Sequence, residues 1–496
     1  MDKKLVNIGI DNNLKKYSNE IEYVFRIFMN ICGYPFRLVY IDLDKKYSDQ
    51  VNKLGLYYGT SPECINASIK IKYLGHDYLG ASSVAPIGYA EENDIPFVKF
   101  VETGRCMQDD AGNPVFLNDI VFSSFWVLTG GQENSYYQDR YGNYHLEDTF
   151  YLKNSLNIKP LVSIYATIIK KYLLRHKDGL GFGKPQSLPY ICESKKAAIA
   201  LSHDVDYPEI IKWIECIRIL GKKKLSGLKF LLPIINGSCN FWKFPEWVEF
   251  EKAIFAKSAF YFMGRQGSLL EYFLGRPDAF YDIKTKKFSE LFTFLKDEGF
   301  EIGMHASFNA YKSKDIFLAE KISVEQASKA IIYGNRHHYW HLKPGDNQDT
   351  LKIHEKVGLL YDSSLHFEFY PGFRRGICHP FYPYDISERR QIRVLQLPPA
   401  WMDNQFDSHN KKNKIQDEIG YARKIMKIVS ATEGVLTLDY HVRGMNEEFY
   451  PKYGAWLKRL LLQDDCFRDF NFITPVKIAQ CWAEHAKNIN PGVNFL

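Results

Sequence analysis

The sequence has no Cys-x-x-Cys pair, no long apolar run and no large excess of one charge. Its nine cysteines are an odd number and lie far apart, which favours reduced thiols in a cytoplasmic protein over a disulfide framework. The richest apolar segment, residues 160–174, contains Ser163, Lys170 and Lys171, so no stretch reaches the roughly 18 apolar residues of a membrane-spanning helix. The apolar residues 5–10 are too few for a signal peptide. We therefore expect a soluble, cytoplasmic protein without a transmembrane segment.

Charge and aromatic content narrow the possible partners. The formal net charge is +6 over 496 residues, and the longest basic run is Lys222–Lys224. Nucleic-acid binding needs a stronger basic footprint, so the sequence argues against it. The lysine run is typical of a solvated helix end or loop, although an anionic membrane or a lipid-linked substrate could use it. Aromatic residues make up 15% of the chain, which suits both core packing and sugar-stacking surfaces.

A linker composition divides the chain into two parts. The length of 496 residues is too great for one compact core and predicts two domains. Residues 176–189 contain three glycines and two prolines among polar residues, which is typical of a linker. We predict a smaller mixed α+β domain of unknown role at 1–185 and a second domain at 195–496. Apolar residues at helical spacing predict helices at 21–32 and 161–174 in the first domain.

Short apolar strands alternate with helical patterns in the second part. Helices are predicted at 289–298, at 324–333 behind a Ser323-x-x-Gln326 capping box, and at 418–432. Such alternation implies parallel strands with crossover helices, and it favours an α/β fold with a distorted (β/α) barrel over an open doubly wound sheet. The predicted strands are 197–202, 258–263, 301–305, 336–341, 359–363, 393–398, 435–441 and 470–474.

Polar residues collect at the carboxyl ends of these strands, which is the active-site face of a barrel. Asp204 and Asp206 are two residues apart on an extended backbone and therefore point to the same side. Two close carboxylates stay ionised more easily beside a cation, so a metal is their natural partner, and a pair that caps a turn is the alternative. His305, Arg336 and His441 fall at other strand ends and are expected at the same face.

The order of these pieces resembles the polysaccharide deacetylase family, the carbohydrate esterases related to chitooligosaccharide deacetylase. The first family motif is an Asp pair, which makes Asp204 the implied base and Asp206 the implied metal ligand. The second motif is a strand that ends in His, with another His four residues later. Here His305 matches the first, and Asn309 stands in place of the second. Asn309 can bind a metal through its carbonyl oxygen, although this is a harder donor than imidazole.

Three further motifs extend the resemblance over about residues 195–485. In the third, Arg336 is implied to orient Asp204, and the backbone N–H of Tyr339 is implied to hold the oxyanion. In the fifth, His441 is the implied general acid, a role that suits a group titrating near neutrality. The resemblance also implies substrate-binding residues. They are Trp401 and Asp403 of the fourth motif and His338 of the third. Arg374 is added because the segment Gly372-Phe373-Arg374 resembles family variants that carry an extra N-terminal domain.

The resemblance implies a metal-dependent hydrolase that removes an N-acetyl or related acyl group from a sugar in bacterial surface-polysaccharide metabolism. The implied cofactor is a divalent metal, with zinc the first candidate, and the implied partners are an N-acetylated sugar, a nucleotide sugar or a lipid-linked glycan. A glycan-binding pseudoenzyme or scaffold without metal is one alternative, which Asn309 favours. The second is a barrel-type glycoside hydrolase, for which Asp204 and Asp206 lie too close together, so that Asp403 or Asp439 would have to take part.

Overall fold

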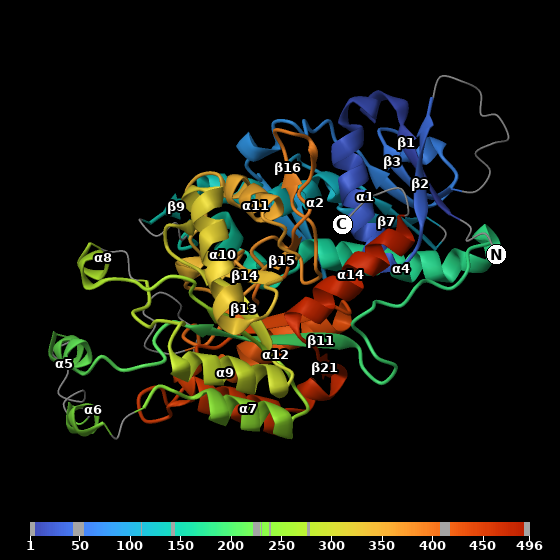
Figure 1. The fold of residues 1–496 in the computed structure, drawn as a ribbon. Coiled ribbons are helices and arrows are strands. Elements are labelled where there is room, and N and C mark those ends of the chain that lie inside the picture. Colours follow the sequence, from blue (N-terminus) through green and yellow to red (C-terminus); the bar gives the residue numbers. More distant parts are fainter. Residues whose placement is uncertain are drawn as a thin grey trace.

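The structure is a computed structural model, in which one mainly parallel sheet and one wholly parallel sheet dominate the fold (Figure 1). It describes residues 5–42, 54–110, 112–139, 144–221, 229, 231–237, 240–274, 278–406 and 417–490. The basic run Lys222–Lys224 lies outside these ranges.

The first sheet belongs to the N-terminal part of the chain. Its six strands follow the order β2-β1-β3-β4-β8-β7, and all neighbours are parallel except β7 and β8. Helix α1 ends where Gly33 adopts a left-handed conformation that glycine accepts without strain. The strands of this sheet are β1 Val6–Asp11, β2 Phe36–Ile41, β3 Leu54–Gly59, β4 Ala67–Lys72, β7 Met107–Asp110 and β8 Asn113–Phe116. The helices are α1 Ser18–Cys32, α2 Ile120–Thr129, α3 Phe150–Lys153 and α4 Leu161–Leu180, and the hairpins are β5 Gly88–Glu92 with β6 Ile95–Lys99 and β9 Tyr137–Gln138 with β10 Tyr144–His145.

The second sheet carries the strand ends singled out by the sequence. Its order is β18-β15-β14-β13-β12-β11-β20-β19, with β21 also pairing with β11, and every pair is parallel. Only residues 397–400 connect the two outermost strands, so the sheet must curl towards itself. The predicted α/β fold with a distorted (β/α) barrel is therefore confirmed. The strands are β11 Ala197–Val205, β12 Ala259–Phe262, β13 Glu301–Ala306, β14 Gly334–His337, β15 Tyr361–Asp362, β18 Leu395–Gln396, β19 Trp401–Met402, β20 Val435–Asp439 and β21 Phe470–Phe472.

Helices cover this sheet, and the bounds of one of them differ from the prediction. The predicted helix at 324–333 instead runs from Lys314 to Ser328, because Ser313 caps it by accepting the N–H of Ile316, and Lys329 ends it in a left-handed conformation. The helices of this part are α5 Lys212–Gly221, α6 Leu231–Asn236, α7 Phe244–Ala253, α8 Leu269–Phe273, α9 Lys286–Asp297, α10 Lys314–Ser328, α11 Asn347–Lys356, α12 Glu418–Ala431, α13 Gly454–Gln463 and α14 Pro475–Ile489, and a short hairpin pairs β16 Tyr384–Asp385 with β17 Arg390–Gln391.

The two parts of the chain pack closely against each other. Helix α14 runs from the second sheet to the N-terminal part (Figure 1), where His485 donates to the carbonyl of Asn30 over 2.8 Å. The buried Ser163 of α4 lies 2.9 Å from Nδ1 of His379. We keep the domain division at 185–195 as a proposal, since each side of it contributes one of the two main sheets. In the described ranges, no helix is both long and apolar enough to cross a bilayer.

Candidate metal centre

Three buried side chains meet at the carboxyl ends of β11, β13 and β14. Nε2 of His305 lies 3.1 Å from Oδ1 of Asp206, and Nε2 of His338 lies 3.7 Å from the same oxygen. One possible ligand atom from each of Asp206, His305 and His338 falls within 4.8 Å of the others. The strands place these residues together because their parallel pairing puts all three carboxyl ends at one edge. Two imidazoles and one carboxylate are a donor set that suits a divalent transition metal.

The outer ring nitrogens of both histidines have partners that fix the ring orientation. Nδ1 of His305 donates to the carbonyl of Arg336 over 2.8 Å, and Nδ1 of His338 lies 3.3 Å from Oδ1 of Asp278. Asp278 is itself held by the N–H of Phe308 at 2.8 Å. A ring whose Nδ1 donates outward presents the lone pair of Nε2 inward, as metal-binding histidines usually do. The cluster therefore fits a divalent metal.

The backbone turns sharply directly after His338. Tyr339 and Trp340 both have positive φ, at 57° and 54°. Two consecutive bulky residues in the left-handed region are strained, by about 1–3 kcal/mol each, and such strain is usual at functional sites. The same turn ends β14 at His337, so the run that the sequence suggested as strand to His341 is shorter than predicted.

Arg336 lies buried between two carboxyl groups. Its Nη1 donates to Oδ1 of Asp204 over 2.9 Å and lies 2.8 Å from Oδ1 of Asp439. Burial opposes ionisation of Asp204, but Arg336 and the neighbouring histidines outweigh it and lower the pKa of Asp204. Burial and the negative charge of Asp204 raise the pKa of Asp439 to about 8. Near neutral pH, Asp204 is thus ionised and Asp439 keeps its proton.

His441 lies on the other side of Asp206, between two acids. Its Nε2 is 3.0 Å from Oδ2 of Asp206, and its Nδ1 is 3.1 Å from Oδ2 of Asp403. The backbone N–H of His441 also donates to Asp403, over 2.9 Å. Burial lowers the pKa of His441, but Asp403 and Asp206 outweigh it and hold the pKa well above its usual value. His441 is therefore a protonated group that can donate a proton.

The strand-end residues that the sequence singled out come together, and two residues predicted to bind substrate lie with them: His338 in the cluster and Asp403 against His441. Asn309, Trp401 and Arg374 have different surroundings. Asp204, Asp206, His305, Arg336 and His441 form one cluster, through the contacts described above. Asn309 heads a short 3-10 helix beyond β13, and His338 supplies the second imidazole of the cluster. Trp401 is fully buried, and its indole N–H donates to the hydroxyl of Tyr440. Its ring is thus covered by protein and not presented to a sugar.

Arg374, predicted to bind substrate, joins the two parts of the chain instead. Its Nε donates to Oε1 of Glu133 over 2.7 Å, and its Nη1 donates to the carbonyl of His366. Because the guanidinium is buried and paired, we assign Arg374 a role in holding the fold together. Glu133 lies 241 residues away, so no sequence pattern could have suggested this pair.

Two residues of the site were missed by sequence reasoning. Asp278 orients His338, and Arg443 places Nη1 3.4 Å from Oδ2 of Asp206. The position of Arg443, two residues after His441, was a usable signal because both follow the same strand end. Asp278 stands in an irregular segment with no motif around it, so only the fold reveals it.

Glu320 supports the loop after β13 and makes the stability of the fold depend on pH. It accepts from the N–H of Ser307 over 2.8 Å and from the Ser307 hydroxyl. Burial raises the pKa of Glu320 from 4.5 to about 7. Because the pKa is higher in the folded state than in the unfolded state, this contribution to stability is complete below about pH 4.5 and is lost as the pH rises through about 7.

We expect Glu320→Gln to reduce the fall in the free energy of unfolding between pH 5 and pH 8 by about 1–3 kcal/mol. Urea unfolding at both pH values measures this difference. The exposed Glu290 on α9 provides a control, because Glu290→Gln should leave the pH dependence as in the unchanged protein. An equal pH dependence in the Glu320→Gln variant would contradict the assigned titration.

Comparisons with known proteins give a family of unknown function and distant structural matches. The model of a family of unknown function (DUF7033) matches residues 12–178. No curated protein matches the sequence. The allantoinase Puue is 12% identical with a TM-score of 0.40, covering 63% of this chain and 97% of its own. The polysaccharide deacetylase Bc1974 from Bacillus cereus is 13% identical with a TM-score of 0.27, covering 56% and 91%. A family 4 acetyl xylan esterase from Clostridium thermocellum, in complex with cobalt, is 11% identical with a TM-score of 0.24, covering 57% and 90%.

Proposed function

We propose that this chain is a metal-dependent hydrolase that removes an N-acetyl or related acyl group from a sugar in bacterial surface-polysaccharide metabolism. The observation that carries this proposal is the order of groups across the site. An ionised Asp204 paired with Arg336 lies 3.8 Å from His305 of the Asp206–His305–His338 cluster. A protonated His441 paired with Asp403 lies 3.0 Å from Asp206 of the same cluster. A base and an acid that each contact a metal-binding cluster suit hydrolysis of an amide.

Asp206, His305 and His338 would hold the metal. A divalent ion bound there supplies Lewis acidity to an acyl carbonyl and to the attacking water. Zinc is the first candidate because it accepts imidazole nitrogen and carboxylate oxygen together in a four-coordinate site. The pKa of Asp206 lies well below its usual value, since His338, His441 and His305 together outweigh its burial. Asp206 is thus ionised and ready to bind a cation over a wide pH range.

Asp204 is the proposed general base. Arg336 holds its carboxylate by a hydrogen bond of 2.9 Å, while hydroxyl groups of Ser202 and Ser363 accept from Nη2 of the same guanidinium. This network orients Asp204 so that its other oxygen, Oδ2, lies 3.8 Å from Nε2 of His305 at the metal cluster. From this position Asp204 takes a proton from the water that attacks the acyl carbon.

His441 is the proposed general acid. Asp403 fixes the imidazole through Nδ1 and keeps it charged, so Nε2 carries the proton that the leaving nitrogen needs. The side chain of His441 is 13% exposed, more than those of Asp204 and Asp206, as expected for a group that meets the substrate. The backbone N–H of Tyr339 is the proposed donor to the oxyanion.

An acetate-release assay tests these roles. The substrates are N-acetylated nucleotide sugars and lipid-linked oligosaccharides, each with and without added divalent metal. We expect metal-dependent release of acetate that falls by about 10²–10⁴-fold in Asp204→Ala and in His441→Ala, the usual contribution of a general base or acid. Asp315→Ala, a change of an exposed acid on α10, should keep full turnover.

The outcomes of this assay separate the three functions. Wild-type turnover in both site variants would refute the assigned roles. Release of reducing sugar without acetate would favour a glycoside hydrolase. Glycan binding by a protein that takes up no metal would favour a pseudoenzyme or scaffold.

A further inference from the structure

Helix α5 exposes the side that a surface helix normally buries. Trp213, Ile217 and Leu220 recur at i, i+4 and i+7, so they form one stripe, and each is about half exposed or more. The opposite side of the helix carries Glu215, which is buried. An apolar stripe that faces outward lacks its partner within the described part of the chain.

Helix α6 continues this outward apolar surface. Leu232 and Ile235 point away from the body, whereas Ile234 packs inward against Phe241. The ammonium group of Lys212 donates to the carbonyl of Ile235 over 2.9 Å, which ties α6 to α5. The two helices thus have a small core of their own and still leave five large apolar side chains in solvent.

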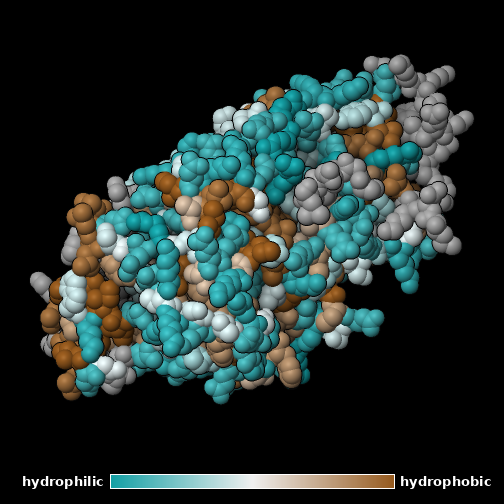
Figure 2. All heavy atoms as spheres, viewed as in Figure 1, coloured by the Kyte–Doolittle hydropathy of each residue, from teal (hydrophilic) through white to brown (hydrophobic). Residues whose placement is uncertain are grey.

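Helix α8 and the residue after it add three more exposed leucines. They are Leu269, Leu270 and Leu274. Helices α5, α6 and α8 lie at the same end of the molecule, away from the N-terminal sheet (Figure 1). Hydrophobic side chains gather at this end of the space-filling view (Figure 2). We call the eight residues the apolar tip: Trp213, Ile217, Leu220, Leu232, Ile235, Leu269, Leu270 and Leu274, which are between 38% and 69% exposed.

The sequence around α5 and α6 is strongly basic. Residues 212–232 contain six cations, namely Lys212, Arg218, Lys222, Lys223, Lys224 and Lys229, and one acid, Glu215. Among the described residues, Lys212 and Lys229 are exposed. Exposed apolar side chains within a basic stretch of sequence are typical of a protein that lies in the interface of an anionic bilayer, where apolar groups enter the acyl region and cations remain at the headgroups.

We propose that the apolar tip is a membrane-docking surface, and that its partner is a bilayer with anionic lipids. The protein lies on the bilayer and does not span it, which agrees with the short helices that build the tip. A second protein would offer a complementary cavity or groove, whereas side chains on three separate helices at one end of the molecule suit a fluid surface.

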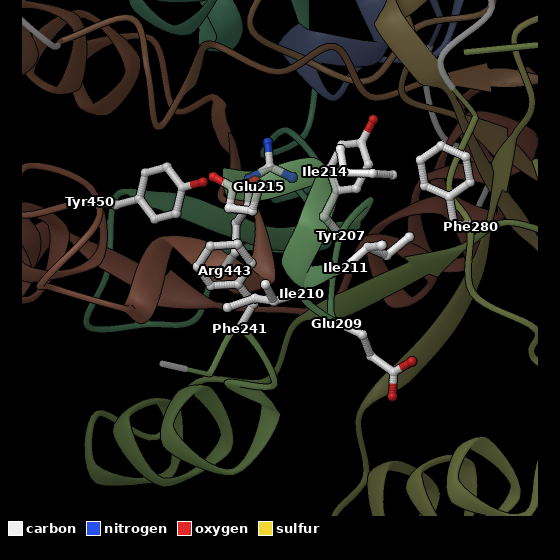
Figure 3. Close-up of a pocket in the computed structure, with 10 residues that line it drawn as sticks. All are labelled: Tyr207, Glu209, Ile210, Ile211, Ile214, Glu215, Phe241, Phe280, Arg443 and Tyr450. Atoms are coloured by element: carbon white, nitrogen blue, oxygen red, sulfur yellow. The ribbon is translucent and has the colours of Figure 1, made fainter. Parts of the chain in front are cut away.

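A pocket lies between the segment after β11, helix α5 and Arg443, which contacts the metal centre. It is lined by Ile210, Ile211, Ile214, Phe241 and Phe280, together with the polar side chains of Tyr207, Glu209, Glu215, Arg443 and Tyr450. Figure 3 shows these side chains, which come from the segment after β11, from α5, from the segments before α7 and α9, and from the chain after β20. Arg443 lines the pocket and contacts Asp206 at 3.4 Å. The pocket thus shares helix α5 with the apolar tip and Arg443 with the metal centre. If the proposed hydrolase function holds, the substrate is a glycan carried on a lipid.

Vesicle co-sedimentation tests the docking without any turnover. The full chain is mixed with vesicles of phosphatidylcholine alone, or of phosphatidylcholine and phosphatidylglycerol in equal amounts. We expect binding to the anionic vesicles that weakens at high salt, because part of the attraction is electrostatic. In Ile217→Ser/Leu220→Ser/Leu232→Ser, we expect the apparent partition coefficient to fall at least about tenfold, since three apolar side chains no longer enter the interface.

A second triple variant is the matched control. Phe255→Ser/Ile331→Ser/Leu462→Ser removes three apolar side chains that are at least as exposed but lie outside the apolar tip. It should bind as the unchanged protein does, and thermal unfolding should show that both variants are folded. Absence of vesicle binding by the unchanged protein, or equal binding by both variants, would overturn the proposal. A dimer in light scattering that the first variant converts to monomer would assign the tip to a second copy of the chain.

Discussion

Replacing His338 by alanine should weaken the binding of a divalent metal by more than about 100-fold, whereas Asn309→Ala should leave it nearly unchanged. His338 supplies one of only two imidazoles in the cluster, and its Nε2 faces Asp206 at 3.7 Å. Loss of a partner that merely orients a ligand already costs about 10–100-fold in affinity, so loss of the ligand itself should cost more. Asn309 lies on the adjoining 3-10 helix and offers at best an amide oxygen.

Calorimetric titration of Zn²⁺ and Co²⁺ into the purified chain measures both affinities without any substrate. Asp278→Asn should give an intermediate loss, because it weakens the acceptor that orients Nδ1 of His338. A variant Asn309→Ala that loses as much affinity as His338→Ala would instead support the ligand set implied by the family resemblance. Equal affinity in all three variants would place the metal elsewhere.

Replacing Arg336 by methionine should lower the free energy of unfolding by about 3–5 kcal/mol, the usual cost of breaking a buried ion pair from one side. Asp204 and Asp439 both contact this guanidinium, and all three side chains are buried. Without Arg336, Asp204 loses the cation that offsets its burial. Methionine at position 336 also cannot donate the hydrogen bonds that Nη2 of Arg336 gives to the hydroxyls of Ser202 and Ser363.

Urea unfolding followed by circular dichroism measures this loss. The double variant Arg336→Met/Asp204→Asn should recover part of it, because removal of the second charge leaves no unpaired carboxylate at this position. The free energy of unfolding of Arg336→Lys should lie between those of the unchanged protein and Arg336→Met, since lysine keeps the charge but not the planar guanidinium. A loss below about 1 kcal/mol in Arg336→Met would mean that the pair with Asp204 does not stabilise the fold.

Much of the second sheet follows from local sequence patterns. The run from Ala197 to Val205 is buried along its whole length, as a central parallel strand requires, and the strands at 301–305 and 435–441 were found at nearly the observed positions. Because parallel strands end at one edge, the residues that follow them had to meet. The strand-end pattern thus predicts that Asp206, His305 and His441 lie together, as they do.

Local sequence patterns predict less well where the surroundings of a side chain are set by residues far away in the sequence. The helix predicted at 324–333 began at the wrong serine, since the capping signal at Ser323 resembles the one that Ser313 provides. Trp401 and Arg374 were expected to meet substrate, but Tyr440 and Glu133 occupy their polar groups. Partners of this kind are set by packing between segments far apart in the chain.

Alternating apolar runs and the acids, histidines and arginine behind them were enough to predict a curled parallel sheet with a cation site at its carboxyl edge. Which imidazole completes that site depended on the folded chain. A strained turn at Tyr339 and Trp340 follows His338, and Asp278 holds its ring, while the ligand role of Asn309 implied by the motif stays a prediction. Spacing along a strand specifies which edge a residue reaches, but backbone strain and contacts across the fold specify which atoms face one another.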